Sequence, residues 1–184
     1  LYTDPNLPDS DKNYVNYNVP EISVNDNRKD IIDKITENAR DSELSRLTLY
    51  AYRLMDNIDW LPFIKAAVER NPVCFQDLNG KSIQEVLYVL NAMTDESIYD
   101  GQRLAQPDEV WNFRRGDGIE KALLLADYIV QKDGKADIVI TIENHKVRLI
   151  SNGSEYRFKS NKSFNKTIEI KSNDINSPLT LIVR

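Results

Sequence analysis

A run rich in Leu, Ile and Ala from Ile119 to Val130, with charges at Glu120, Lys121 and Asp127, restricts the possible folds of this chain more than any other segment. The run is too long for an ordinary strand, so it predicts a helix that is buried on almost every side. Asp117 and Glu120 form a capping pair at its start. From Ile138 onward the apolar residues alternate with polar ones, which predicts strands. Because no helix separates these strands, their sheet must be antiparallel.

Turn signals divide the alternating region into short strands. Asn152-Gly153 is the strongest hairpin signal in the chain, and a further turn is expected at Asn144-His145. The C-terminal part is therefore predicted as a meander of about five strands. The apolar positions place these strands at 138–142, 147–149, 156–158, 168–170 and 179–183.

Upstream of the buried helix, apolar residues recur at three-and-four spacing, which predicts several amphipathic helices. Capping residues place their starts near Asn27, Asp41, Asp59 and Ser82. The stretch 94–106 has no clean period and is expected to be a loop. The predicted fold class is α+β, with an N-terminal helical half, one buried central helix and a C-terminal antiparallel β-sheet.

The domain organisation follows from these patterns and from the polar, proline-containing start of the chain. Residues 1–25 are expected to form an extended or disordered leader. Residues 26–184 are expected to form a single α+β domain. Within it, 26–135 is the helical part and 136–184 is the β-meander.

Composition excludes several classes of function. The chain has 184 residues, a net charge of -5, one Cys and one His. The negative charge argues against a nucleic-acid partner, and two potential ligands cannot complete a structural zinc site. No cofactor fingerprint is present, so neither a metal nor a cofactor is predicted. No apolar run reaches the roughly 18 residues that a membrane-spanning helix needs.

The first residues also bear on location. The sequence begins at Leu1 without a methionine, which fits either a processed export leader or a trimmed chain. The Asp-, Asn- and Pro-rich start is typical of a spacer after a secretion signal or a lipid anchor upstream of Leu1. Export to the periplasm or cell surface is therefore favoured over a cytoplasmic location. Cys74 lies in an apolar patch and is expected to be a buried, inert thiol.

A segment around the central helix carries a more specific pattern. It contains a Pro-x-Glu element at 107–109, an Arg-Gly pair at 115–116, and Gly116-Asp117-Gly118 followed by Ile-Glu-Lys-Ala and leucines. This segment, 106–126, resembles the core of the transglutaminase-like superfamily, which places Gly-Asp-Cys at the start of a buried helix. The order of the elements extends the resemblance loosely over residues 42–160.

The resemblance implies an active site that has lost its nucleophile. In the family, a cysteine at the helix N-terminus is favoured as thiolate by the helix dipole, a histidine acts as base, and an Asp or Asn orients it. Gly118 occupies the cysteine position here, so acyl transfer by that route is impossible. His145 falls at the histidine position, although the family usually has His-Ala-Trp where this chain has His-Lys-Val. Asn161 is the best match to the third position.

Ordinary structural roles are the alternative for every residue in this segment. Gly116 to Gly118 can be a turn and helix cap, while His145 and Asn161 can be exposed turn residues. Ligand contacts are the competing interpretation for the residues that flank the cap. These binding candidates are Trp111, Phe113, Arg114, Arg115 and Asp117.

Three hypotheses about function remain open. The first is an exported, non-catalytic transglutaminase-like domain that serves as a binding or structural module for a protein, glycan or peptide. The second is a structural or interaction domain of a larger cell-envelope protein with no small-molecule site. The third is a hydrolase that uses carboxylates in the same cleft. An open cleft around Gly118 favours binding, and a filled one favours a structural role.

Overall fold

The chain groups into two compact units in the computed structural model, which describes residues 16–172 and 178–184. The first unit ends at Ala51 and the second comprises residues 52–184. The sequence places all of residues 26–184 in one domain, whereas this division falls at the end of the second helix. Of the expected leader, residues 1–15 lie outside the described residues, and residues 16–25 contain no helix or strand.

The described part of the first unit is a pair of helices, α1 (Arg28–Asn38) and α2 (Glu43–Tyr52), of which Tyr52 belongs to the second unit. The predicted cap is confirmed, because the Asn27 side chain accepts hydrogen bonds from two backbone N–H groups of the first turn. The Asn38 side chain donates to the Ser45 hydroxyl at 2.8 Å and so joins α1 to α2.

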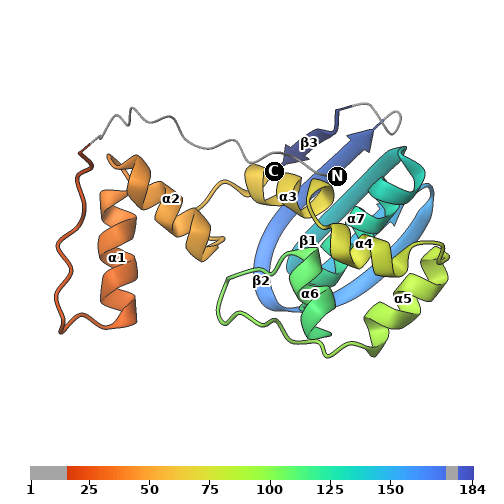
Figure 1. Ribbon diagram of the computed structural model, residues 1–184, viewed down its shortest axis with the longest axis horizontal. Helices are drawn as coiled ribbons and strands as arrows, with labels where there is room; N and C mark the ends of the chain where they lie inside the picture. The colour runs from red at the N-terminus through yellow and green to blue at the C-terminus, as the bar shows by residue number, and fades with distance from the viewer. Residues whose placement is uncertain (1–15, 173–177) are drawn as a thin grey trace, which may run out of the picture. The chain divides into compact units, whose positions relative to one another are not determined.

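The second unit contains the remaining helices and all the strands of the described chain (Figure 1). Short helices precede a long central one, and the strands follow it. The elements are α3 (Trp60–Glu69), α4 (Pro72–Leu78), α5 (Ile83–Ala92), α6 (Pro107–Phe113), α7 (Gly118–Asp133), β1 (Ala136–Ser151), β2 (Ser154–Ser172) and β3 (Thr180–Val183).

Helix α7 is the centre of this unit, as predicted. Every residue from Gly118 to Val130 is buried. The helix contacts α3, α4, α5 and α6 as well as β1 and β2, so it has partners on all sides. Asp117 and Glu120 form the expected capping box, and Gly134 ends the helix in the left-handed conformation at φ 63°.

The sheet has three strands in the described residues, in the order β1-β2-β3, and all pairs are antiparallel. The prediction of about five strands is wrong. Asn144 adopts φ 55°, and a bulge between Asn144 and Lys146 kinks β1 without ending it. The expected turn at Asn144-His145 is therefore this bulge, and two predicted strands merge into β1. Two more merge into β2, while the hairpin at Asn152-Gly153 is confirmed.

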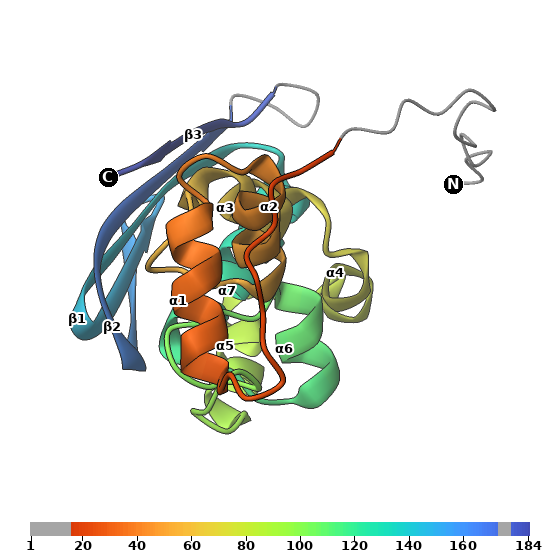
Figure 2. The same ribbon diagram turned by 90° about the vertical axis from the view of Figure 1, so that its left-hand side faces the viewer.

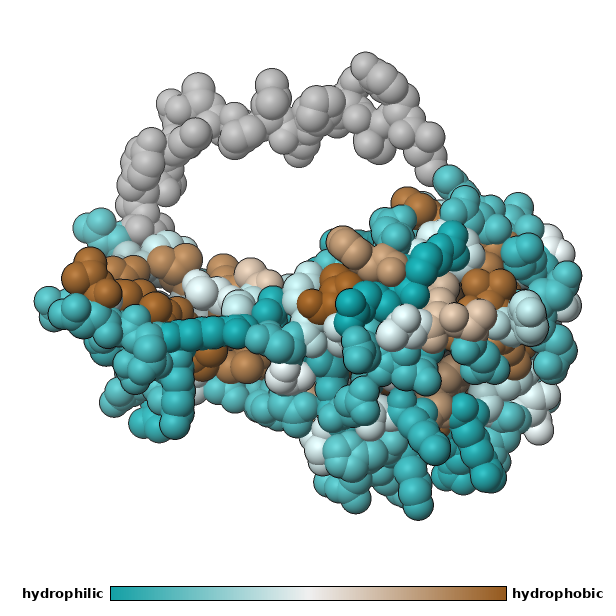
Figure 3. All heavy atoms as spheres, turned by 90° about the horizontal axis from the view of Figure 1, so that it is seen from below, coloured by the Kyte–Doolittle hydropathy of each residue, from teal (hydrophilic) through white to brown (hydrophobic). Residues whose placement is uncertain are grey.

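Figures 1 and 2 show β1 and β2 as a curved layer with helices α3 to α7 on one of its faces. Ile138, Ile140 and Ile142 of β1 are at most 1% exposed, so the core lies between this layer and α7. The face of the second unit seen in Figure 3 is mostly hydrophilic. None of the helices in the described residues has the length and hydropathy needed to cross a membrane.

Candidate functional site

The segment that resembles a transglutaminase site lies where the N-terminus of α7 meets β2. Asp117 is 1% exposed and caps α7 by accepting a hydrogen bond from the N–H of Ile119 at 3.0 Å. Its carboxylate also accepts from the hydroxyl of Ser160 at 2.7 Å and from the N–H of Asn161 at 2.7 Å. One carboxylate therefore fixes the helix start to the strand as well as capping it.

Glu120 is the second buried carboxylate of the capping box, and it has no exposed surface. It accepts hydrogen bonds from the Asp117 N–H at 2.8 Å, the Ala105 N–H at 2.8 Å and the Ser97 hydroxyl at 2.5 Å. Burial raises the pKa of Glu120, although these hydrogen bonds and the charge of Lys162 oppose the rise. No substrate can reach a carboxylate that is enclosed in this way.

Lys162 of β2 binds the loop between α5 and α6, which covers the Glu120 carboxylate. The side chain is 6% exposed, and its ammonium donates to the carbonyls of Tyr99 and Gly101 at 3.0 and 2.9 Å. Burial lowers the pKa of Lys162, while the negative charges of Glu120 and Asp117 raise it. The lysine and the carboxylates thus form one buried charge cluster whose hydrogen bonds end within the protein.

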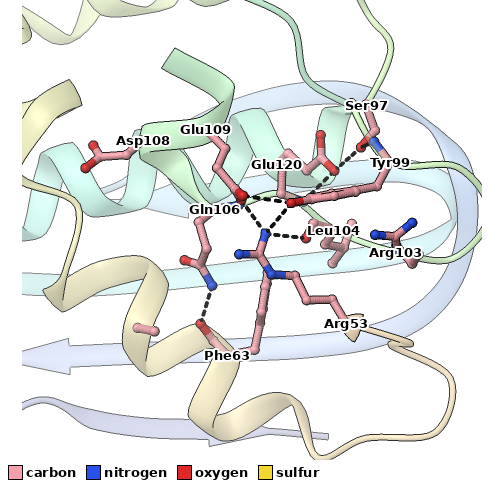
Figure 4. A network of polar contacts seen from close by, with 12 residues as sticks. Arg53, Phe63, Ser97, Tyr99, Arg103, Leu104, Gln106, Asp108, Glu109 and Glu120 are labelled. Carbon is pink, nitrogen blue, oxygen red and sulfur yellow. Dashed lines mark hydrogen bonds and ion pairs between the residues drawn. The ribbon is translucent and has the colours of Figure 1, made fainter. Parts of the chain in front are cut away.

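A second polar network extends from the loop to the start of α6 (Figure 4). Tyr99 donates its phenol proton to Glu109 at 2.8 Å, and Arg53 forms an ion pair with the same carboxylate. Burial acts to raise the pKa of Glu109, but hydrogen bonds from Arg53, Gln106 and Tyr99 hold it below its ordinary value. The Arg103 guanidinium lies 4.4 Å from the Tyr99 ring centroid. Glu109, Arg53 and Arg103 therefore hold Tyr99, and with it the loop, in place.

The space beside Gly118, the position that the resemblance matches to the family's cysteine, is closed by the backbone of β2. A Cβ atom added to Gly118 would lie 2.2 Å from the carbonyl oxygen of Lys159 and 2.6 Å from its carbonyl carbon. Real side chains do not tolerate such distances, and the obstacle is main chain inside a sheet rather than a movable side chain. Position 118 therefore accommodates glycine alone unless β2 moves.

The structure brings Gly118, Asp117 and His145 to three successive positions of β2, one of which is the predicted Asn161. Gly118 meets Lys159, and Asp117 binds Ser160 and Asn161. The Nδ1 atom of His145 lies 3.2 Å from the carbonyl oxygen of Ser160, so this exposed histidine also reaches the cluster. The Asn161 side chain donates to the carbonyl of Asp95 at 2.9 Å rather than to the histidine.

The flanking candidates separate into packing and surface residues. Trp111 is 5% exposed and donates its indole N–H to Asp77 at 2.6 Å, which is a packing role. Arg114 covers the Trp111 ring at 3.5 Å, and Arg115 pairs with Glu96 at 2.7 Å. Phe113 is 62% exposed. The two aromatic residues therefore do not form a shared ligand platform.

A depression of about 390 Å³ opens beside the start of α7. It is lined in part by Arg115, Asp117, Asn161 and Lys162, together with residues of the 96–102 loop. Among the described residues no group of His, Cys, Asp and Glu side chains is arranged to hold a metal ion. The depression is open to solvent, and Glu120 is not among the residues that line it.

Sequence patterns missed the residues that complete the network: Arg53, Ser97, Tyr99 and Lys162. Lys162 could have been found from strand parity, because Phe158, Ser160 and Phe164 are buried at the same alternate positions of β2. The loop residues carry no such period. The chain matches no protein-family model, and neither a curated protein nor a solved structure matches it.

Proposed function

We propose that residues 52–184 form a non-catalytic domain of transglutaminase-like architecture that acts as a structural or interaction module, exported with the rest of the chain. The observation that carries this proposal is the carbonyl of Lys159, 2.2 Å from the Cβ that any nucleophilic side chain at position 118 would need. The place of the nucleophile is filled by the sheet itself. A filled site favours a structural role over a cleft that takes a small molecule.

The remaining reactive groups support the same interpretation. Glu120 is 0% exposed and all its hydrogen bonds go to the protein, which argues against a hydrolase based on that carboxylate. Cys74 is 1% exposed, and burial raises its pKa well above the ordinary value of a thiol. Such a thiol carries almost no thiolate at neutral pH and cannot replace the missing nucleophile.

Binding of a polar ligand is the second candidate, and one observation favours it. The depression beside α7 exposes parts of Arg115 and Asn161 to solvent, and both could contact an anionic or amide-containing group. Arg115 is already engaged by Glu96, however, and Asn161 by Asp95. A ligand would have to displace these contacts, so we rank this function second.

The test is a pair of substitutions at Gly118. Gly118→Ala gains at most about 1 kcal/mol of helix propensity, whereas forcing a side chain into closed packing costs about 1–3 kcal/mol or more. We therefore expect urea unfolding to show a net loss of stability, with a value near 2 kcal/mol. Gly116→Ala is the matched control, because its Cβ would meet only the side chain of Val110, at 2.8 Å. Its loss should be smaller.

Gly118→Cys in a Cys74→Ala background separates the proposal from a retained open site. We expect a destabilised protein whose thiol alkylates no faster than a free cysteine. A stable variant whose thiol has a pKa well below about 8.5 would mean that the site is open, and the proposal would fail. Wild-type protein should neither hydrolyse peptides nor link amines to glutamine peptides, and either activity would also contradict it.

A further inference from the structure

Four cations lie opposite one another on the outer face of the β1-β2 ribbon, between the bulge and the hairpin turn. Lys146 lies directly opposite Lys159 in the β1-β2 register, and Arg148 lies directly opposite Arg157. All four residues are exposed, whereas Val147, which lies between two of them, is buried against the core. Because side chains alternate along a strand, the four cations share one face. We call Lys146, Arg148, Arg157 and Lys159 the cationic quartet.

The quartet is an unfavourable arrangement for an isolated sheet. Side chains directly opposite in an antiparallel pair are about 5 Å apart, and like charges there destabilise the pair. The chain as a whole has a net charge of -5, so the quartet does not reflect a basic composition. Glu155 pairs with Arg157 at 2.6 Å. Among the described residues, the other three cations form no salt bridge.

The quartet also borders a concave surface and an open strand edge. A hollow of about 540 Å³ is lined by all four cations, by the carboxylates Glu143 and Glu155, and by Thr141, Val147 and Phe158. In the described sheet β1 pairs only with β2, so its other edge has no partner strand. Residues 143–146 are exposed one after another, without the alternation of a covered strand, so this edge is open to solvent.

Protection against aggregation is the ordinary explanation for charges on an edge strand. That role needs charges on β1 alone, and charges of alternating sign would fulfil it without repulsion across the strands. Here β2 carries cations at the positions that oppose Lys146 and Arg148. The arrangement is explained better by an anion that neutralises both pairs when it binds.

We propose that the cationic quartet docks an extended acidic segment of a partner polypeptide. Carboxylates at alternate positions of an extended chain are about 7 Å apart, which is the spacing of Lys146 and Arg148 along β1. The open edge of β1 offers such a segment backbone hydrogen bonds as well. A short segment feels mainly the local charges, because screening over about 8 Å at physiological salt weakens repulsion from the rest of the chain.

This inference gives a partner to the proposed interaction role and rests on it, but it does not depend on Gly118. If the Gly118 experiment shows an open site, the proposed closed site is wrong, but the charges of the quartet are unaffected. Failure of the binding experiment below would remove the partner and leave the closed site unchanged. The two results are therefore distinguishable.

The experiment measures binding of a fluorescent synthetic peptide, in which glutamate alternates with threonine, to the full chain by anisotropy. We expect wild-type protein to bind it, with an affinity that falls as salt rises. Arg148→Glu and Lys146→Glu should each weaken binding about tenfold or more. Lys65→Glu, which reverses an exposed charge on α3, is the matched control and should change binding less than about twofold.

A second measurement shows that lost binding does not reflect lost folding. Each reversal replaces a like-charged cross-strand pair by an oppositely charged one, so the urea midpoints should stay equal or rise. Equal binding of a glutamine-for-glutamate peptide, or no binding of the acidic peptide, would overturn the proposal. A sulfated oligosaccharide or anionic vesicle that binds more tightly than the peptide and responds to the same variants would also overturn it, in favour of a glycan or lipid.

Discussion

Asp127 of α7 is a fully buried carboxylate that lies next to Cys74, the only cysteine of the chain. It accepts hydrogen bonds from the amide of Gln131 at 2.7 Å and from the thiol of Cys74 at 3.4 Å. Burial raises the pKa of Asp127 to about 7, and the charge of Asp108 adds to the rise, while the two hydrogen bonds oppose it. The Asp127 carboxyl therefore ionises near neutral pH although it is buried in the protein core.

The pH dependence of stability follows from that shift. The folded pKa lies above the ordinary value of 3.8, so between these values the folded protein holds the proton more tightly than the unfolded chain. This group's contribution is largest below pH 3.8 and is lost as pH rises toward about 7. Asp127→Asn should remove the loss and stabilise the protein at pH 8 by an amount on the order of 2–4 kcal/mol.

Urea unfolding of wild-type and Asp127→Asn proteins at pH 5 and pH 8 checks this prediction. The variant's advantage should be larger at pH 8, where the wild-type carboxylate is charged. The exposed carboxylate of Asp137 provides the control, because Asp137→Asn should change stability little at either pH. An Asp127 variant with no advantage at pH 8 would mean that the carboxylate is better solvated than its burial indicates.

The loop between α5 and α6 contains no helix, and charged side chains from α7 and β2 hold its conformation by hydrogen bonds and an ion pair. Lys121 of α7 donates to the carbonyl of Met93 at 2.9 Å and pairs with Asp95 at 2.5 Å. Glu120 binds the middle of the loop and Lys162 binds it near Gly101. Backbone groups that would otherwise be orphaned are satisfied by these contacts. The conformation of the loop thus depends on α7 and β2.

Lys162→Met should loosen this loop more than the rest of the fold. The substitution keeps much of the apolar stem but removes two charge-assisted hydrogen bonds to loop carbonyls. Hydrogen exchange of residues 97–105 should accelerate about tenfold or more, because each lost bond of this kind contributes roughly 1.5–3 kcal/mol.

Lys135→Met, at an exposed position, is the matched control and should leave loop exchange unchanged. The informative comparison is between the loop and α7. If amides of α7 accelerate as much as those of the loop, Lys162 stabilises the whole unit and the loop has no separate opening reaction.

At the scale of the whole molecule, the second unit has a core built from its own residues. The buried side chains that surround α7, such as Phe63, Val86, Ile138 and Ile168, all lie within residues 52–184. Both tryptophans, Trp60 and Trp111, belong to this unit and are at most 5% exposed. Tryptophan fluorescence of the full chain therefore reports on the second unit alone.

Residues 52–184 should therefore fold without the first unit. We expect the isolated fragment to unfold cooperatively in urea, with a free energy within about 1 kcal/mol of that measured for the full chain by tryptophan fluorescence. The full chain measured in parallel is the reference. A fragment with exposed tryptophans and no cooperative transition would show that the first unit is required for folding.

Features set by neighbouring residues could be predicted from sequence, and features set by distant residues could not. Helix α7 and its caps follow from Asp117, Glu120 and the leucines between them, and the hairpin follows from Asn152-Gly153. Two of the predicted strands merge into β1 because a left-handed Asn144 can form a bulge as well as a turn. Local sequence does not distinguish the two outcomes.

The candidate site shows the same limit more sharply. The pattern around Gly118 predicted the start of α7, and the structure places that start against Lys159 of β2. Whether that start faces solvent depends on Lys159, which lies far along the chain and has no pattern that marks its carbonyl. The contacts of Tyr99 and Lys162 likewise depend on how the loop and strand pack, which only the three-dimensional arrangement determines.

The contact between Gly118 and the Lys159 carbonyl also limits which substitutions can persist at this position during evolution. Two of the four glycine codons, GGU and GGC, become cysteine codons by a single base change, so a gene that uses either of them can acquire a thiol at this helix start in one step. Each such allele meets the main chain of β2 at 2.2 Å and is selected first for its effect on folding, before any reactivity can be tested. A reactive side chain at position 118 therefore requires a shift of β2 as well as the substitution itself, so at least two changes are needed.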